Sequence, residues 1–352
     1  MQYSQADTAR RNRERLPLIS LAILAAGFTL FISITFFTWW LFMPERDNQY
    51  GDPGLTPAQT ELANGLESDV RHLAETIGER NMHRRGTMDT TAAWIEQRFR
   101  EMGYEPVRHT YELQRGIYLG RTADNIIAEL QGTRNPETII IAGAHYDTVP
   151  GSPGANDNGT AVAALLALAD YFSGRIADYT IRFVAFANEE PPFFKTRDMG
   201  SYAYAGTLRD RNEQVKAMFS MDGLGSFSTE PGSQHYPLPG IGLIYPDRAD
   251  FIGFVTRFRD LRLMKSALKT FRNEAEIAAE GVALPGLVPG VDWSDHWSFW
   301  QHDFPAFMVT DTLPFRDRYY HTPMDTPDKI DFERMTLVVE GLKKVVAELA
   351  SE

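Results

Sequence analysis

Short apolar runs alternate with segments of helical periodicity through most of this chain, and this alternation constrains its fold more than any other feature. Thr138–Ala142, Ile181–Ala187 and Met218–Met221 have the apolar character of buried strands. Residues 161–172 and 201–208, which follow the first two runs, show helical spacing. Such alternation predicts parallel strands joined by crossover helices. We therefore expect an α/β domain of three layers, with a mostly parallel central sheet flanked by helices.

Further elements extend this pattern toward both ends of the chain. Thr56 precedes a helical segment that runs to Ile77, and Thr91 precedes another that is closed by Gly103. Additional strands are expected around Tyr111 and over residues 125–130 and 304–309, and an amphipathic helix over residues 332–350. No internal repeat interrupts the order of elements, so we expect one large domain.

Side chains able to bind a metal ion follow the apolar runs, at the positions where strands should end. In α/β sheets, ligands bind beyond the carboxyl ends of the strands. One acidic loop residue alone is more often a surface or capping carboxylate, but the joint pattern predicts a site. Its candidate members are His145, Asp147, Asp157, Glu189, Glu190, Asp222 and His321.

Composition narrows the chemistry of such a site. The chain of 352 residues has no cysteine, so only imidazole and carboxylate groups are available as strong ligands for zinc. A net charge of -12 argues against a nucleic-acid partner, because the phosphate backbone would be repelled. Hydrophobic residues make up 43% of the chain, which is enough for a packed core.

Six ordered motifs resemble those of the co-catalytic di-zinc aminopeptidases, a family that includes bacterial leucyl aminopeptidase, aminopeptidase Y, glutamate carboxypeptidase and the related glutaminyl cyclases. The resemblance covers residues 55–352, and six matches in order are far more specific than any one motif. The motifs are Ala144–Thr148, Gly154–Gly159, Asn188–Glu190, Ser220–Gly223, Trp293–His296 and Tyr320–Asp325.

The resemblance implies two zinc ions that share the carboxylate of Asp157. One ion would be completed by His145 and Asp222, and the other by Glu190 and His321. Three protein ligands for each ion leave a position open for water or substrate, as in catalytic zinc sites. A hydroxide that bridges the two ions would then be the nucleophile.

Two further carboxylates receive catalytic roles. The resemblance makes Glu189 the general base that takes the proton of the attacking water and delivers it to the leaving amine. Asp147 lies two residues beyond His145, so its side chain points the same way on an extended backbone and can orient the imidazole. Asp295 has a supporting role in one interpretation and caps a helix in the other.

One departure from the family pattern concerns the group that stabilises the oxyanion. Some relatives place a tyrosine three residues before the serine that corresponds to Ser294, whereas this chain has Val291. Stabilisation would then come from the metals alone or from another donor such as Tyr320 or His235.

The predicted function is that of a zinc-dependent exopeptidase, an aminopeptidase that acts on peptide substrates. Three alternatives keep the fold and change the role: a glutaminyl cyclase, a carboxypeptidase or dipeptidase, and a receptor-like protein without catalysis. The presence of His145 favours two metals over the single zinc of the cyclases, and the intact ligand set argues against a non-catalytic role.

The N-terminal part of the chain predicts a membrane anchor. Residues 18–43 contain no charged side chain and are long enough to cross a hydrocarbon core of about 30 Å. Arginines at positions 10, 11, 13 and 15 predict a cytoplasmic N-terminus and an extracytoplasmic catalytic domain. A cleaved secretory signal and a buried helix are the alternatives, but the run exceeds an ordinary signal and lacks a polar face.

The resulting domain prediction has four parts. Residues 1–16 form a cytoplasmic tail, residues 17–44 the transmembrane anchor, residues 45–56 a linker with Gly51, Pro53 and Gly54, and residues 57–352 the zinc peptidase domain.

Overall fold

The computed structural model describes residues 23–37, 41–43, 54–84 and 86–351, which belong to two compact units, Met1–Met43 and Pro44–Glu352. In the first unit, residues 23–37 are helical and are followed by strand β1 (Phe42–Met43). No helix among these described ranges combines the length and apolar character needed to cross a membrane. The predicted span over residues 17–44 lies in part outside the described residues.

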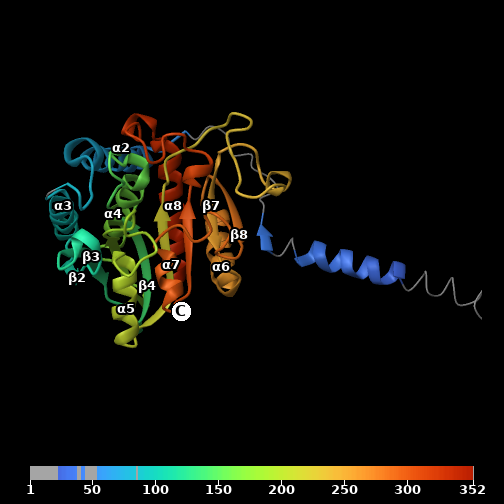
Figure 1. The fold of residues 1–352 in the computed structure, drawn as a ribbon, viewed down its shortest axis with the longest axis horizontal. Coiled ribbons are helices and arrows are strands. Elements are labelled where there is room, and N and C mark those ends of the chain that lie inside the picture. The colour runs from blue at the N-terminus through green and yellow to red at the C-terminus, as the bar shows by residue number, and fades with distance from the viewer. Residues whose placement is uncertain (1–22, 38–40, 44–53, 85, 352) are drawn as a thin grey trace, which may run out of the picture. The chain divides into compact units, whose positions relative to one another are not determined.

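The second unit is built on a mixed sheet whose strands lie in the order β8-β7-β9-β6-β4-β5-β3-β2 (Figure 1). Their bounds are β2 (Val107–Glu112), β3 (Thr122–Leu130), β4 (Asn135–His145), β5 (Tyr179–Phe186), β6 (Gln214–Asp222), β7 (Phe251–Thr256), β8 (Ala278–Ala283) and β9 (Ala306–Thr310). The four central strands β5, β4, β6 and β9 run parallel.

On both sides of these four central strands, the sheet departs from the expected parallel arrangement. Strand β3 is antiparallel to β5 and β2 is antiparallel to β3, while β7 and β8 are parallel to each other but β7 is antiparallel to β9. The short connection between β2 and β3 permits only antiparallel pairing, because a parallel pair requires a longer crossover. The α/β class with flanking helices is therefore confirmed, and the sheet is mixed.

Two groups of helices flank the sheet. Helices α3, α4, α8 and α6 pack in succession beside one another, whereas α5 packs against α7 and against β2 and β3. The bounds are α2 (Pro57–Arg71), α3 (Thr87–Glu101), α4 (Ala161–Phe172), α5 (Gly200–Asp210), α6 (Leu261–Glu274), α7 (His296–Gln301) and α8 (Phe332–Leu349). The elements α6, β7 and β8 were not among those expected from the sequence.

Two helix starts test the capping predictions. Thr56 is the N-cap of α2 and forms a capping box with Gln59, as expected for the start of this helix. Helix α3, however, begins at Thr87 after Gly86, so Thr91 lies inside the helix and its hydroxyl donates to the carbonyl of Thr87. The helix therefore begins five residues before the predicted start, and its N-cap is Gly86 instead of Thr91.

The parallel centre determines where a site can form. Strands β4, β5, β6 and β9 are neighbours that end at the same edge of the sheet. His145 is the last residue of β4 and Asp222 is the last residue of β6. The loops that follow the central strands consequently meet at this edge.

Candidate metal centre

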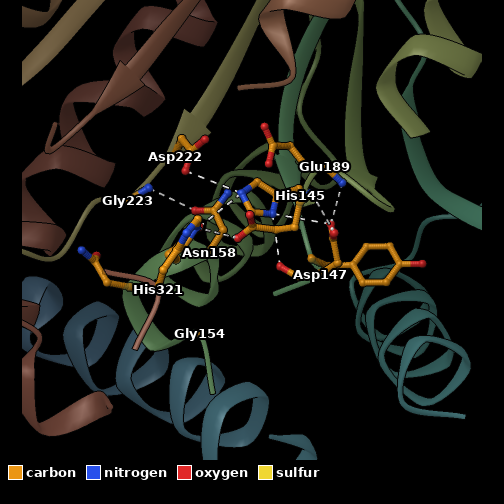
Figure 2. A network of polar contacts seen from close by, with 12 residues as sticks. His145, Asp147, Gly154, Asn158, Glu189, Asp222, Gly223 and His321 are labelled. Carbon is orange, nitrogen blue, oxygen red and sulfur yellow. Dashed lines mark hydrogen bonds and ion pairs between the residues drawn. The ribbon is translucent and has the colours of Figure 1, made fainter. Parts of the chain in front are cut away.

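The first cluster of candidate ligands joins the ends of β4 and β6 to the loop that precedes α4. His145 Nε2 lies 3.6 Å from Asp222 Oδ1 and 3.4 Å from Asp157 Oδ1. In Figure 2 a dashed line joins His145 to Asp222. The three side chains are almost completely buried, and their ligand atoms lie within 4.8 Å of one another.

The second cluster forms on the other oxygen of the same aspartate. Asp157 Oδ2 lies 3.0 Å from His321 Nε2, which is also 3.2 Å from Glu190 Oε1. The imidazole of His321 stacks on the ring of Tyr320, with 3.7 Å between their centroids. The structure thus brings together all five residues predicted as ligands, and Asp157 faces both clusters.

The donor set fits a pair of zinc ions. Each cluster offers one imidazole nitrogen and two carboxylate groups, and such sets of three protein ligands are typical of catalytic zinc. In the part of the chain that the structure describes, Asp222 Oδ1 is buried without a hydrogen-bond partner. An oxygen left in this state is costly unless another group, such as a cation, satisfies it.

The pKa values of the carboxylates reflect their confinement. Burial, together with the charge of Asp157, raises the pKa of Glu190 to about 8. Burial also raises the pKa values of Glu189 and Asp222. Burial acts in the same direction on Asp157, but its contacts with the two histidines outweigh burial and lower its pKa. Without a nearby positive charge, these buried carboxylates repel one another when they are ionised together. A divalent cation would therefore stabilise their charged forms.

The histidines show the complementary effect. Burial lowers the pKa of His321, but the contacts with Asp157 and Glu190 dominate and raise it to about 10. For His145, burial is likewise outweighed by Asp147, Asp157 and Asp222, so its pKa is raised well above the ordinary value. Zinc ions would replace these protons, because only neutral imidazole binds a metal.

Asp147 connects the first cluster to the glutamate pair. Its Oδ1 lies 3.6 Å from His145 Nδ1, while its backbone carbonyl lies 3.2 Å from the same nitrogen. Its carboxylate oxygens accept hydrogen bonds from the backbone N–H groups of Glu189, at 2.9 Å, and Glu190, at 3.0 Å. Figure 2 shows this carboxylate between His145 and the backbone of Glu189. Asp147 therefore holds the glutamate segment in addition to contacting the imidazole.

Glu189 lies beside both clusters and belongs to neither. Its side chain is buried and lines the same pocket as His145 and Asp157. Its Oε1 has no hydrogen-bond partner among the residues that the structure describes. The carboxylate is therefore placed to exchange a proton with a molecule in the pocket.

Asp295 is buried near the first cluster, immediately before α7. Asp295 is the N-cap residue of this helix, but its carboxylate makes no capping hydrogen bond to it. Burial raises its pKa to about 7, and the charges of His145, Asp222 and Asp147 also act on it. This location agrees with the supporting role expected for it.

A pocket of about 350 Å³ opens beside the two clusters. Phe251, Gly253 and Val255 of β7 are among the residues that line it, and its size is in the range of small-molecule sites. His235 and Tyr320, the two alternative oxyanion donors, both line it, as does Val291. The stacking of Tyr320 on His321 holds this phenol ring close to the second cluster.

Sequence reasoning gave no role to two residues that contact the Asp157 loop. Arg80 follows the first helical segment and is fully buried, which its polar neighbours in the sequence did not reveal. Asp325 lies in a motif that resembles the family, but its contacts depend on backbone groups far away in the chain.

Comparison with known proteins places this architecture in a family. The model of peptidase family M28 matches residues 125–346. The uncharacterized protein YfbL of Escherichia coli is 35% identical over 285 residues, which cover 79% of this chain and 85% of the relative. Leucine aminopeptidase 1 of Arthroderma otae is 24% identical over 335 residues, covering 85% of this chain and 83% of the relative.

Solved structures share the fold. A zinc aminopeptidase from Bacillus subtilis superposes with a TM-score of 0.63 at 17% identity and covers 82% of this chain and 95% of its own. The LapA aminopeptidase of Legionella pneumophila has a TM-score of 0.64 at 21% identity, with 88% of this chain and 78% of its own covered. Together with the family match over most of the second unit, these findings show that the chain is a member of peptidase family M28.

Proposed function

We propose that this chain is a zinc-dependent aminopeptidase that removes N-terminal residues from peptides. The observation that carries the proposal is the position of Asp157 at the wall of a pocket. One of its carboxylate oxygens belongs to each of the two clusters of three ligands. His145 and Asp222 would complete the site for one zinc ion, and Glu190 and His321 the site for the other. Zinc bound in this way supplies Lewis-acid polarisation of the scissile carbonyl and lowers the pKa of water.

Glu189 and Asp147 have different roles in the proposed reaction. Glu189 receives the proton of the attacking water and later delivers it to the departing amine, since its carboxylate lines the pocket outside both clusters. Asp147 holds the backbone of Glu189 and Glu190 through two hydrogen bonds, which fixes the base relative to the ligand.

An aminopeptidase is favoured over the alternatives by the complete ligand set and by the relatives. His145 is present at the end of β4, whereas a cyclase with one zinc needs no second set of ligands. Several relatives are named aminopeptidases, including YwaD of Bacillus subtilis, which is 33% identical over 122 residues. Glutaminyl cyclase of Fimbriiglobus ruber shares the fold at 18% identity, so the fold by itself does not choose between the two reactions.

Substrate profiling of the purified protein tests the proposal. We expect cleavage of amino-acid amides and of peptides with free N-termini, loss of this activity with a chelator, and recovery when zinc is restored. N-acetylated peptides should remain intact, because their N-terminus is blocked. Cyclisation of N-terminal glutamine would instead indicate a cyclase, and release of C-terminal residues a carboxypeptidase. Absence of both zinc and turnover would support the receptor-like alternative.

We also propose that residues 17–44 anchor the protein in a membrane with the catalytic domain outside the cytoplasm. The uncharged run over residues 18–43 and the arginines that precede it support this topology. The protein should remain with the membrane fraction after an alkaline wash, and protease added from outside should degrade the catalytic domain in intact cells. Recovery of the full-length chain in the cytosol would contradict this topology.

A further inference from the structure

Arg80 is a buried cation with two of its hydrogen bonds on the segment that carries Asp157. Its Nε donates to the carbonyl of Tyr146 at 2.8 Å, Nη1 to that of Pro153 at 2.7 Å, and Nη2 to that of Gly154 at 2.9 Å. Nη1 also donates to the carbonyls of Leu73 and Gly78, each at 3.0 Å. One guanidinium therefore connects the end of the first helical segment to Tyr146, which directly follows β4, and to the start of the Asp157 loop.

Asp325 binds the other end of the same short loop. Its Oδ1 accepts the backbone N–H of Asn156 at 2.7 Å, and its Oδ2 accepts the backbone N–H of Asp157 at 3.1 Å. The backbone carbonyl of Asp325 also accepts the N–H of Ala155 at 3.2 Å. Because Asp325 follows His321 by four residues, the carboxylate that fixes Asp157 belongs to the same loop as a ligand of the second cluster.

The conformation of Gly154 makes this close approach possible. Its φ is +63°, which favours glycine, and a Cβ there would lie 2.9 Å from Arg80 Nη2 and 2.2 Å from Thr148 Cγ2. The carbonyls of Pro153 and Gly154, which precede Asp157, thus face Arg80. The N–H groups of Asn156 and Asp157 face Asp325. The segment Pro153–Asp157 is held through its main chain at both ends.

We propose that Arg80 and Asp325 together position the carboxylate of Asp157, which the two metal clusters share. This inference rests on the proposed function, since it assigns the pair to the loop that holds the shared metal ligand. Neither residue belongs to a cluster, so both act through the backbone of the loop and are positioning residues. Partners of this kind orient metal ligands in proteins and typically change metal affinity about 10–100-fold when they are lost.

The charge of Arg80 supports the same role. Burial lowers its pKa to about 10, while the carboxylates of Asp325, Asp147 and Asp157 oppose this effect, so the guanidinium remains charged at neutral pH. A lysine could keep the charge, but its ammonium has three N–H donors and cannot reproduce the planar fork that reaches these carbonyls. The Arg80→Lys substitution therefore tests the geometry of the guanidinium separately from its charge.

The test compares the full-length protein with its Arg80→Lys and Asp325→Asn variants. Zinc affinity is measured by competition with a chelator, and hydrogen exchange at the N–H groups of Asn156 and Asp157 is measured in metal-free protein. We expect zinc to bind about 10–100-fold more weakly in both variants. We also expect the two N–H groups to exchange faster, because their carboxylate acceptor is displaced or weakened.

Arg98→Lys is the matched control, since Arg98 pairs with Asp69 between α2 and α3, away from the metal loop. It should leave zinc affinity and exchange at the two N–H groups unchanged, even where it lowers thermal stability. Wild-type zinc affinity in both test variants would overturn the positioning role. If Arg80→Lys fails to fold, Asp325→Asn decides the outcome.

The two proposals fail in different ways. A wild-type protein that binds no zinc contradicts the proposed function. Slow exchange at Asn156 and Asp157 that both substitutions accelerate would still support the positioning of the loop, because that measurement is made without metal. Zinc binding and peptide hydrolysis that are unaffected by the variants would overturn the positioning role alone.

Discussion

Replacing Glu189 with glutamine is expected to lower kcat by about 10²–10⁴-fold, the usual contribution of general acid–base catalysis. The amide cannot accept the proton of the attacking water, although its size and hydrogen-bonding reach are preserved. Zinc content should remain at two ions per chain, because Glu189 belongs to neither ligand cluster. Steady-state kinetics together with metal analysis of the same preparation measures both quantities.

Glu129→Gln is a suitable control for this substitution. Glu129 lies on β3 and pairs with Arg182, so its replacement changes a charge on the surface and leaves the pocket intact. We expect wild-type kcat in this variant. Wild-type turnover in Glu189→Gln would remove this residue from the mechanism, and loss of zinc would reassign it as a ligand.

Asp157→Asn should have the largest effect on the metal centre itself. An asparagine amide presents one oxygen and loses the negative charge, so it cannot face His145 and His321 with two equivalent ligands. We expect zinc binding to fall from two ions to at most one, and activity to fall to the level of the chelator-treated protein. Isothermal titration with zinc and peptide-hydrolysis assays provide the measurements.

The exposed Asp170 near the end of α4 provides a control in which the same substitution is made outside the metal site. Asp170→Asn removes the same charge from the helix that follows the metal loop and should retain both ions and full activity. If Asp157→Asn still bound two zinc ions with unchanged affinity, the shared-ligand arrangement would be wrong.

Much of the central sheet could be predicted because its strands have a recognisable local sequence pattern. Residues 138–142 and 181–187 are apolar segments of a length typical of strands. His145 and Glu189 follow them within three residues and lie where the parallel strands end. The metal-ligand prediction itself combined this pattern with a resemblance to a family. The structure brings those side chains together, and their ligand role remains a proposal.

The elements between residues 251 and 283 were not predicted, although one of them has a clear local pattern. Helix α6 has apolar residues at Leu261, Met264, Leu268 and Phe271, a spacing that predicts an amphipathic helix. Strand β8 contains Glu280 and Gly281 within six residues, which weakens its resemblance to a buried strand. The direction of β7 against β9 could not be read from the sequence, since it depends on the path of the chain around the pocket.

The sequence by itself determined the α/β class and the order in which ligand-bearing segments occur, because hydrophobic period and strand length are properties of neighbouring residues. Only the tertiary structure decided which backbone groups these side chains reach. Arg80 bonds carbonyls 66 to 74 positions away in the chain, and the carboxylate of Asp147 accepts N–H groups 42 and 43 positions away. Such contacts carry no local signal, since they arise where separate strand ends and loops converge in space.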